Sequence, residues 1–208
     1  MKQFFEEAFR SELDNTIQDL EEQSSVELLT VIYPQADQYR DTELWGGIFC
    51  LFVALLYFFF APTLFGNYTI LFGTWLAFIL GVGLVRWIKP LKRLLVVSKR
   101  RERMTEIMAR AVFQKANIHR TSAHTGVLLF ISVFEQKTYL LWDLGVDMAL
   151  DIDELEELQN SFQSIFKADD TTKALLEKIK KSTVIFKREL PLQPNDVNEL
   201  PNHIEVQL

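Results

Sequence analysis

Carboxylates gather around one apolar run in the second half of the chain. Asp143 directly follows the run TYLLW, Asp147 comes soon after it, and Glu135 lies in the polar turn before it. Because calcium and related divalent cations prefer oxygen ligands, these three side chains form a candidate cation site. Asp151 and Asp153 follow, but their spacing does not match an EF-hand loop and suits the start of a helix. Solvated carboxylates and helix caps are therefore the simpler interpretation.

Other side chains capable of catalysis lack the partners that catalysis requires. The histidines are His119, His124 and His203, and none has the cysteine or acid spacing typical of a zinc site or an activated nucleophile. Ser132 lies in the run FISVF without the Gly-x-Ser-x-Gly turn of a hydrolase. The single cysteine, Cys50, forms neither an internal disulfide nor a metal site by itself. No catalytic residue is assigned from the sequence.

Two apolar runs occupy the middle of the chain. The first covers 44–60, the second covers 69–88, and Arg86 is the first charged residue in either run. Each run is about long enough to cross a hydrocarbon layer ~30 Å thick, and a Pro- and Gly-containing stretch favours a turn between them. We therefore predict a transmembrane helical hairpin over 44–88. Transport is a weaker hypothesis, because two spans without ionisable residues cannot line a path unless they oligomerise.

Basic residues follow the second run directly, whereas the loop 61–68 carries no charge. Segments rich in Lys and Arg beside membrane spans favour the cytoplasm, so we predict two spans in the cell (inner) membrane with both termini cytoplasmic. The N-terminal stretch also lacks the apolar core of a signal peptide. Contact with the anionic membrane surface explains the basic segment more simply than binding of nucleic acid. Its members are Arg86, Lys89, Lys92, Arg93, Lys99, Arg100, Arg101 and Arg103.

The remaining segments predict an α/β domain that the hairpin interrupts. The first piece, 1–43, holds an amphipathic helix over 2–23 and a strand over 26–33. The second piece, 89–190, holds the other strands and helices, and the polar tail 191–208 is expected to lie extended on the surface or to be disordered. Strands that are apolar on both faces predict a small sheet flanked by helices.

The second piece shows periodic helices on both sides of one strand pair. Thr171 or Thr172 is the expected N-cap of the last helix. The predicted elements are a helix over 104–116, a β-hairpin over 126–143, and helices over 151–167 and 171–190.

Several of these segments resemble the TPM domain, a family named after a thylakoid lumen protein, a photosystem-repair protein and an acetylcholine-receptor modulator. The similar features run from Ala111-x-Phe113 through Thr121 to Thr125-Gly126 at the start of a strand. A charged turn and a second strand ending in Asp143-x-Gly145 complete the core. The stretch 24–39 is similar to the first strand of that domain, and NELP at 198–201 is similar to the end of a membrane-protein branch.

The resemblance implies a helix-flanked sheet and a role in assembly, maintenance or modulation of membrane protein complexes. Family members have been linked to complex repair, receptor modulation, calcium binding and phosphatase activity. Typical members carry the domain outside the cytoplasm, whereas this chain has a hairpin inside the domain and lacks a dense carboxylate cluster. We expect a binding or scaffold module whose partners are the lipid bilayer and other membrane proteins or itself. A membrane-anchored, cation-dependent phosphatase is the alternative, with a divalent cation such as calcium as its cofactor.

Overall fold

The computed structural model describes residue 4 and the ranges 6–121, 123–193 and 203–204. The chain divides into two compact units, which are described separately. The sheet unit joins Met1–Ala36 to Glu102–Leu208, and the hairpin unit is Asp37–Arg101. Both apolar runs lie in the hairpin unit. The segments 1–36 and 102–208 on either side of the hairpin unit therefore belong to one compact unit.

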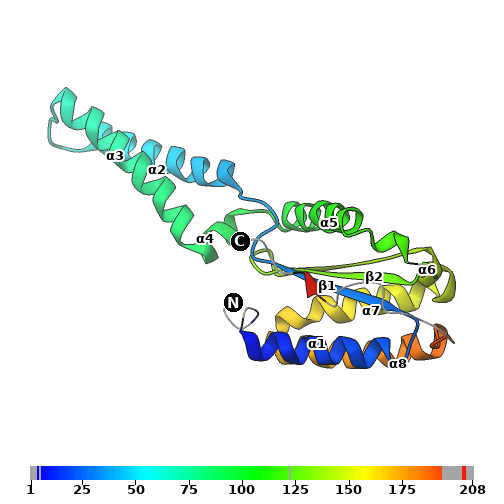
Figure 1. Ribbon diagram of the computed structural model, residues 1–208. Coiled ribbons are helices and arrows are strands. Elements are labelled where there is room, and N and C mark those ends of the chain that lie inside the picture. The colour runs from blue at the N-terminus through cyan, green and yellow to red at the C-terminus, as the bar shows by residue number, and fades with distance from the viewer. Residues whose placement is uncertain (1–3, 5, 122, 194–202, 205–208) are drawn as a thin grey trace. The chain divides into compact units, whose positions relative to one another are not determined.

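Within the described residues, four strands form one mixed sheet in the order β3-β2-β1-β4. The strands β1 (Glu27–Tyr33) and β2 (Gly126–Ser132) pair in parallel, and β2 pairs with β3 (Lys137–Trp142) as the predicted antiparallel hairpin. A parallel pair needs a long crossover connection. The last part of the connection from β1 to β2 contains a helix, Ser98–Lys115 (Figure 1). The fourth strand, β4 (His203–Ile204), pairs with β1, so part of the polar tail extends the sheet. NELP at 198–201 lies outside the described residues.

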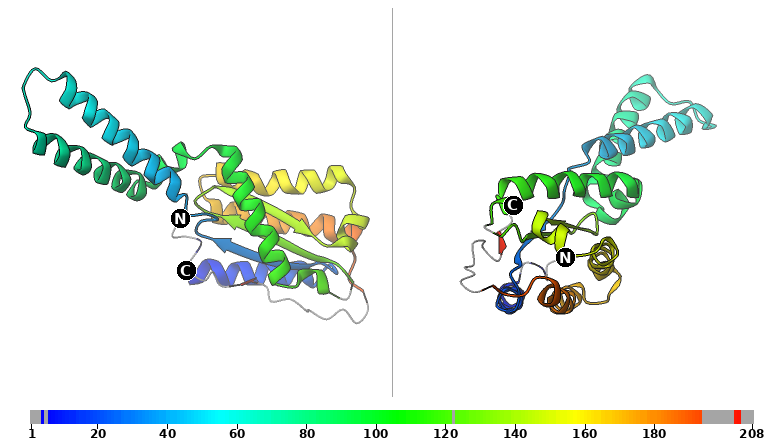
Figure 2. Two further views of the ribbon diagram at one scale, coloured as in Figure 1. Left: turned by 90° about the horizontal axis from the view of Figure 1, so that it is seen from above. Right: turned by 90° about the vertical axis from the view of Figure 1, so that its right-hand side faces the viewer.

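Helices cover both faces of the sheet, because successive strand residues point to opposite sides and are apolar on each (Figure 2). Leu129 on β2 belongs to the core shared with three helices, and its neighbour Phe130 faces the opposite core under α5. The helices on the first face are α1 (Glu7–Glu21), α7 (Ile152–Gln163) and α8 (Thr171–Glu189), and α5 is Ser98–Lys115. This arrangement confirms a helix-flanked α/β fold.

Two glutamines on α7 close the outer edge of β3. Gln159 accepts a hydrogen bond from the backbone N–H of Leu140 at 2.8 Å and donates one to the carbonyl of Thr138 at 3.1 Å. Gln163 accepts from the N–H of Thr138 at 3.1 Å and donates to the carbonyl of Gln136 at 3.1 Å. The two side-chain amides thus take the place of a further strand at an edge that would otherwise pair with another chain.

Short elements account for most differences from the sequence prediction. A six-residue helix, α6 (Leu144–Ala149), follows β3, and 3₁₀ turns lie at Ile118–Arg120 and Ser164–Lys167. The N-cap of α8 is Asp170 rather than Thr171 or Thr172, because its carboxylate accepts from the backbone N–H groups of Thr172 and Lys173. Periodicity does not detect helices this short, since one or two turns hold too few apolar positions.

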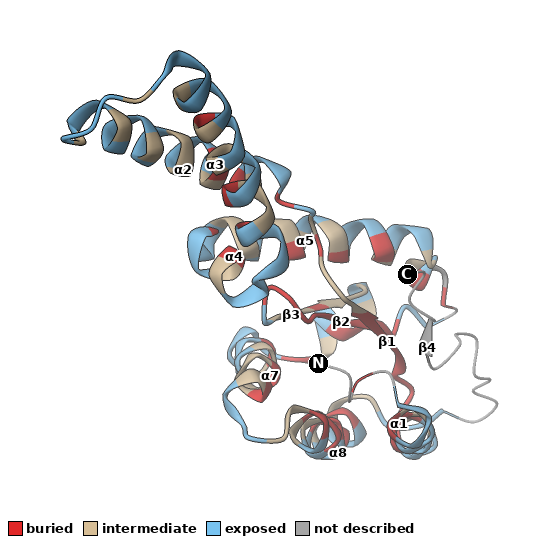
Figure 3. Ribbon diagram, turned by 90° about the vertical axis from the view of Figure 1, so that its left-hand side faces the viewer, coloured by how far each residue is buried: buried red, intermediate tan, exposed pale blue. Residues whose placement is uncertain are grey.

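The hairpin unit holds α2 (Arg40–Phe60), α3 (Asn67–Trp87) and α4 (Lys89–Leu95). The first two are 21 residues long with mean hydropathy 2.0, and only 6% and 17% of their most apolar windows are buried. Figure 3 shows mainly exposed and intermediate residues along α2 and α3, in contrast to the buried strands β1 and β2. The two helices pack closely because a side chain at Gly81 would lie 2.8 Å from the carbonyl oxygen of Gly46. A helical hairpin is confirmed, with each helix long and apolar enough to span a membrane.

Candidate functional site

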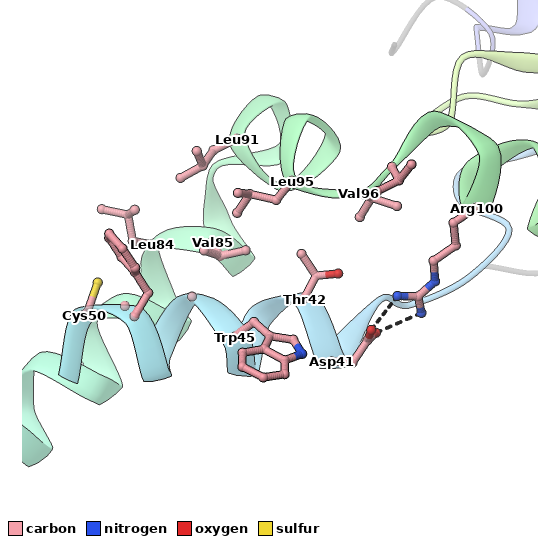
Figure 4. A pocket seen from close by; sticks show the side chains of 14 residues that line it. Asp41, Thr42, Trp45, Cys50, Leu84, Val85, Leu91, Leu95, Val96 and Arg100 are labelled. Carbon is pink, nitrogen blue, oxygen red and sulfur yellow. Dashed lines mark hydrogen bonds and ion pairs between the residues drawn. The ribbon is translucent and has the colours of Figure 1, made fainter. Parts of the chain in front are cut away.

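A cavity of about 720 Å³ lies in the hairpin unit, where α2 begins and α3 ends (Figure 4). Its walls are almost entirely apolar. Thr42, Trp45 and Phe49 come from α2, Leu84 and Val85 come from α3, and α4 closes another side. The described part of the hairpin unit thus forms a hollow whose chemistry suits an apolar ligand.

The sequence forms this cavity through small residues and a change of chain direction. Gly46 and Gly81 both line it, and their lack of side chains lets α2 and α3 approach closely, with Val85 packed against Gly46 and Cys50 against Gly81. The chain then turns at Ile88, with a proline in the first turn of α4. Leu91 and Leu95 are four residues apart, so they share one face of α4 and both line the cavity.

An ion pair forms the polar edge of the cavity. Arg100 donates two hydrogen bonds to the carboxylate of Asp41, one of them at 2.9 Å, and lies 3.5 Å from a carboxylate oxygen of Asp37. Its guanidinium also lies over the ring of Tyr39, 5.2 Å from the ring centroid. The hydrogen bonds to Asp41 raise the pKa of Arg100 above its ordinary value, so this side chain stays charged.

A second ion pair lies inside the unit. The ammonium of Lys92 is buried and donates hydrogen bonds to the carbonyl of Gln38 at 2.5 Å and to the carboxylate of Glu43 at 2.6 Å. A buried ammonium needs such partners, because its desolvation is costly. The pair therefore ties α4 to the beginning of α2.

These contacts revise the predicted membrane-surface set. Lys92 is buried in its pair with Glu43 and is not available to lipid, and Arg100 is engaged by Asp41. The sequence analysis assigned no contact to 37–43 and missed both pairs. The sequence signal that could have indicated these pairs is the placement of acidic residues just before the first apolar run and of basic residues just after the second. Exposed members of the set are Arg86, Lys89, Lys99 and Arg103, and half-buried members are Arg93 and Arg101.

The three carboxylates predicted as a cation site are not brought together. Asp143 and Asp147 follow β3, whereas Glu135 precedes it, and a strand of this length separates its ends by roughly 20 Å. Glu135 is fully buried and accepts hydrogen bonds from the backbone N–H of Ala36 at 3.0 Å and from the Ser132 hydroxyl. Among the described residues, no group of three or more His, Cys, Asp or Glu side chains is placed to hold a metal ion.

Asp143 and Asp147 instead make local contacts at the end of β3. A carboxylate oxygen of Asp143 lies 2.9 Å from Nδ1 of His124, and Asp147 accepts a hydrogen bond from the Trp142 indole at 2.9 Å. His124 has a φ of 56°, and its carbonyl accepts from the N–H of Gly145 at 2.9 Å. A histidine–carboxylate pair orients an imidazole, but acid–base catalysis also requires a reacting group within reach. These contacts join the two loops at that end of the sheet.

The sequence matches no family model and no curated protein. A solved structure of similar fold is the NMR structure of BA42 protein from the psychrophilic bacteria Bizionia argentinensis sp. nov.. The two share 15% sequence identity with a TM-score of 0.57, over 95% of this chain and 91% of that chain. At this identity the likeness shows the fold alone. The chain is thus similar in fold to BA42, and its resemblance to the TPM domain remains a prediction.

Proposed function

We propose that this chain is an integral membrane protein that holds its sheet unit at the bilayer as a binding module for membrane proteins. The observation that carries the proposal is the exposure of apolar side chains along α2 and α3. Phe59 and Phe72, for example, are 81% and 68% exposed. Monomeric proteins in water rarely expose continuous apolar surface on this scale.

The dimensions of the two helices support membrane placement. Helices of 21 residues are about 31 Å long at the usual rise of ~1.5 Å per residue, which matches a hydrocarbon layer of ~30 Å. Every backbone N–H and C=O of a helix interior is paired within the helix, as a bilayer requires. The hairpin returns the chain to the side from which it entered, and the exposed basic residues after α3 favour the cytoplasmic side of the inner membrane.

Binding is favoured over catalysis because the described sheet unit does not assemble a reactive site. The phosphatase alternative needs Asp143 beside at least two further oxygen donors. Glu135 is instead buried in structural hydrogen bonds, and Asp147 is engaged by Trp142. The resemblance to the TPM family adds the theme of work beside membrane complexes, and it suggests that the partner is a membrane protein or a second copy.

Exposed apolar side chains on the sheet unit form a candidate binding surface on which this proposal can be tested. Leu144 and Met148 on α6 and Ile152 at the start of α7 follow one another at four-residue spacing and are exposed. Val184 on α8 is another exposed apolar residue, on an otherwise polar surface. The first group is the candidate contact surface, and Val184 is its matched control.

The experiment is crosslinking in intact membranes followed by purification in detergent and identification of co-purifying proteins. We expect the chain to resist carbonate extraction and to recover a membrane partner in stoichiometric amount. Met148→Glu with Ile152→Glu is expected to lose that partner, and Val184→Glu is expected to keep it. Release of the chain by carbonate would refute membrane insertion. Recovery of the inserted chain alone, with no crosslinked dimer, would refute the binding module.

A further inference from the structure

We propose that the cavity of the hairpin unit binds one acyl chain of an anionic phospholipid, with the phosphate held by exposed basic residues beside it. This inference rests on the membrane placement in the proposed function. It adds a specific ligand and a specific site, and neither follows from two spans alone.

The position of the cavity along the hairpin is the first argument. Trp45 near the beginning of α2 lines the cavity and is 68% exposed, and Trp87 at the end of α3 is 85% exposed. Tryptophan is enriched where the hydrocarbon layer meets the headgroups. The two indoles therefore mark the headgroup level at the end of the hairpin where the cavity lies, so lipid chains begin beside it.

The lining of the cavity is the second argument. Its volume of about 720 Å³ lies within the usual range for small-molecule sites, roughly 300–1,000 Å³, and its walls offer water few hydrogen-bond partners. Apolar walls of this kind favour an apolar molecule over water. In a bilayer the abundant apolar molecule is an acyl chain, and Leu84, Leu91 and Leu95 supply side chains for it to pack against.

Helix α4 explains why the site differs from ordinary lipid-facing surface. Leu91 and Leu95 line the cavity from α4, whereas the adjacent Leu94 is 81% exposed. The buried pair of Lys92 with Glu43 holds α4 against α2. An acyl chain in this half-open cavity thus contacts a third helix and does not merely lie along α2 and α3.

The charges around the cavity favour an anionic headgroup. Asp41 is the carboxylate in the lining, and its paired hydrogen bonds with Arg100 compensate its charge. Arg86 at the end of α3, Lys89 at the start of α4 and Lys99 in the first turn of α5 are exposed. A phosphate at this level therefore meets net positive charge, which is the complement of phosphatidylglycerol and not of a zwitterionic lipid.

The test uses the full chain in vesicles that contain phosphatidylglycerol with a diazirine on one acyl chain. After irradiation, adducts are mapped by mass spectrometry. We expect adducts to concentrate on cavity residues such as Trp45 and Leu95, severalfold above exposed positions in the middle of α3 such as Leu76. Leu84→Trp fills the cavity from α3 and is expected to reduce those adducts severalfold. Leu80→Trp, one turn earlier and outside the lining, is the matched control and is expected to leave them unchanged.

A second variant and a second lipid keep the outcome decisive. Leu95→Trp fills the same cavity from α4. If this variant also reduces the cavity adducts, the effect of Leu84→Trp is not due to misfolding of α3. Phosphatidylcholine with the same diazirine chain is expected to give severalfold fewer cavity adducts. Equal adducts from both lipids, or adducts spread evenly along α2 and α3, would overturn the proposal.

Two further outcomes separate this inference from the proposed function. Covalent dimers formed through cavity residues by a crosslinker would identify a second copy as the occupant and overturn the lipid site while leaving membrane placement intact. Failure of the chain to float with vesicles would refute membrane placement itself, whatever the cavity binds.

Discussion

Phe130 in the sheet unit and Phe72 in the hairpin unit are the same residue type in opposite surroundings. Phe130 is fully buried between β2 and α5, whereas Phe72 on α3 is 68% exposed. The same contrast holds for most apolar residues of the two units. The sheet unit supplies its own apolar environment, but the hairpin unit must obtain one from outside. The part of the hairpin unit that is held by specific polar contacts is its base, where Lys92 and Arg100 meet their acidic partners.

The largest expected effect is the loss of stability when a core phenylalanine of the sheet unit is truncated. Phe130→Ala is expected to lower the free energy of unfolding of the sheet unit by about 3–5 kcal/mol, because it leaves a cavity in a closed core. Phe72→Ala removes the same atoms from an exposed position and is expected to cost less than about 0.5 kcal/mol. Denaturant titration of the detergent-solubilised chain measures both. Similar costs for the two variants would mean that α3 is packed as tightly as the sheet.

The next effect concerns the base of the hairpin. Lys92→Met is expected to destabilise the hairpin unit by about 3 kcal/mol, because the carboxylate of Glu43 stays partly buried without its partner. Lys89→Met, three positions earlier and exposed, is the control and is expected to have little effect. Resistance of the hairpin to proteolysis in detergent is the measurement.

A double variant isolates the pair itself. Lys92→Met combined with Glu43→Gln is expected to cost less than the sum of the single variants, because neither charge is then left alone. Additive costs would contradict a direct interaction between the two side chains.

A smaller effect is expected at the edge of the sheet unit. Gln159→Ala removes both hydrogen bonds to β3 and is expected to cost about 1 kcal/mol, since water replaces part of them. It is also expected to increase self-association, which light scattering detects. Glu156→Ala, exposed on the same helix, is the control. An unchanged oligomeric state would show that α7 protects the edge by bulk alone.

The smallest effect is a pH dependence at the start of α8. Hydrogen bonds from the Thr172 hydroxyl and the Lys173 backbone hold the pKa of Asp170 below its ordinary value of 3.8. Its stabilising contribution is therefore present above pH 3.8 and is lost as the pH falls through the lowered pKa. We expect Asp170→Asn to lower the Tm slightly at pH 6, with the difference shrinking toward pH 3. Asp169→Asn is the control, and a constant difference across this range would contradict the effect.

The principal elements of both units follow from patterns that short stretches of sequence contain. Alternation and turn residues predict the β2–β3 hairpin, and four- and three-residue spacing predicts α1, α7 and α8. Long uncharged runs predict α2 and α3. The elements that were missed, α4, α6 and β4, have seven, six and two residues. Their formation depends on tertiary contacts, as when Lys92 fixes α4 through Glu43.

The candidate site was beyond the reach of sequence reasoning for a related reason. The cavity depends on where α4 turns back toward α2, and no spacing rule specifies that turn. Glu135 illustrates the converse error. A carboxylate in a polar turn is usually solvated, but here Ala36 and Ser132 supply donors that allow burial. The distance between Glu135 and Asp143 follows from the antiparallel hairpin and could have been anticipated once that hairpin was predicted.

The pairing of β1 with β2 sets an order of events during synthesis. Glu27 lies opposite Gly126, and both helices of the hairpin are made between them. While the ribosome adds α2 and α3, β1 has no neighbouring strand to pair with, and its apolar side chains lack their final packing partners. The sheet closes only if 1–36 and the segment from 102 onward reach the same compartment. The sheet unit therefore completes its fold only after the whole hairpin unit has been synthesised.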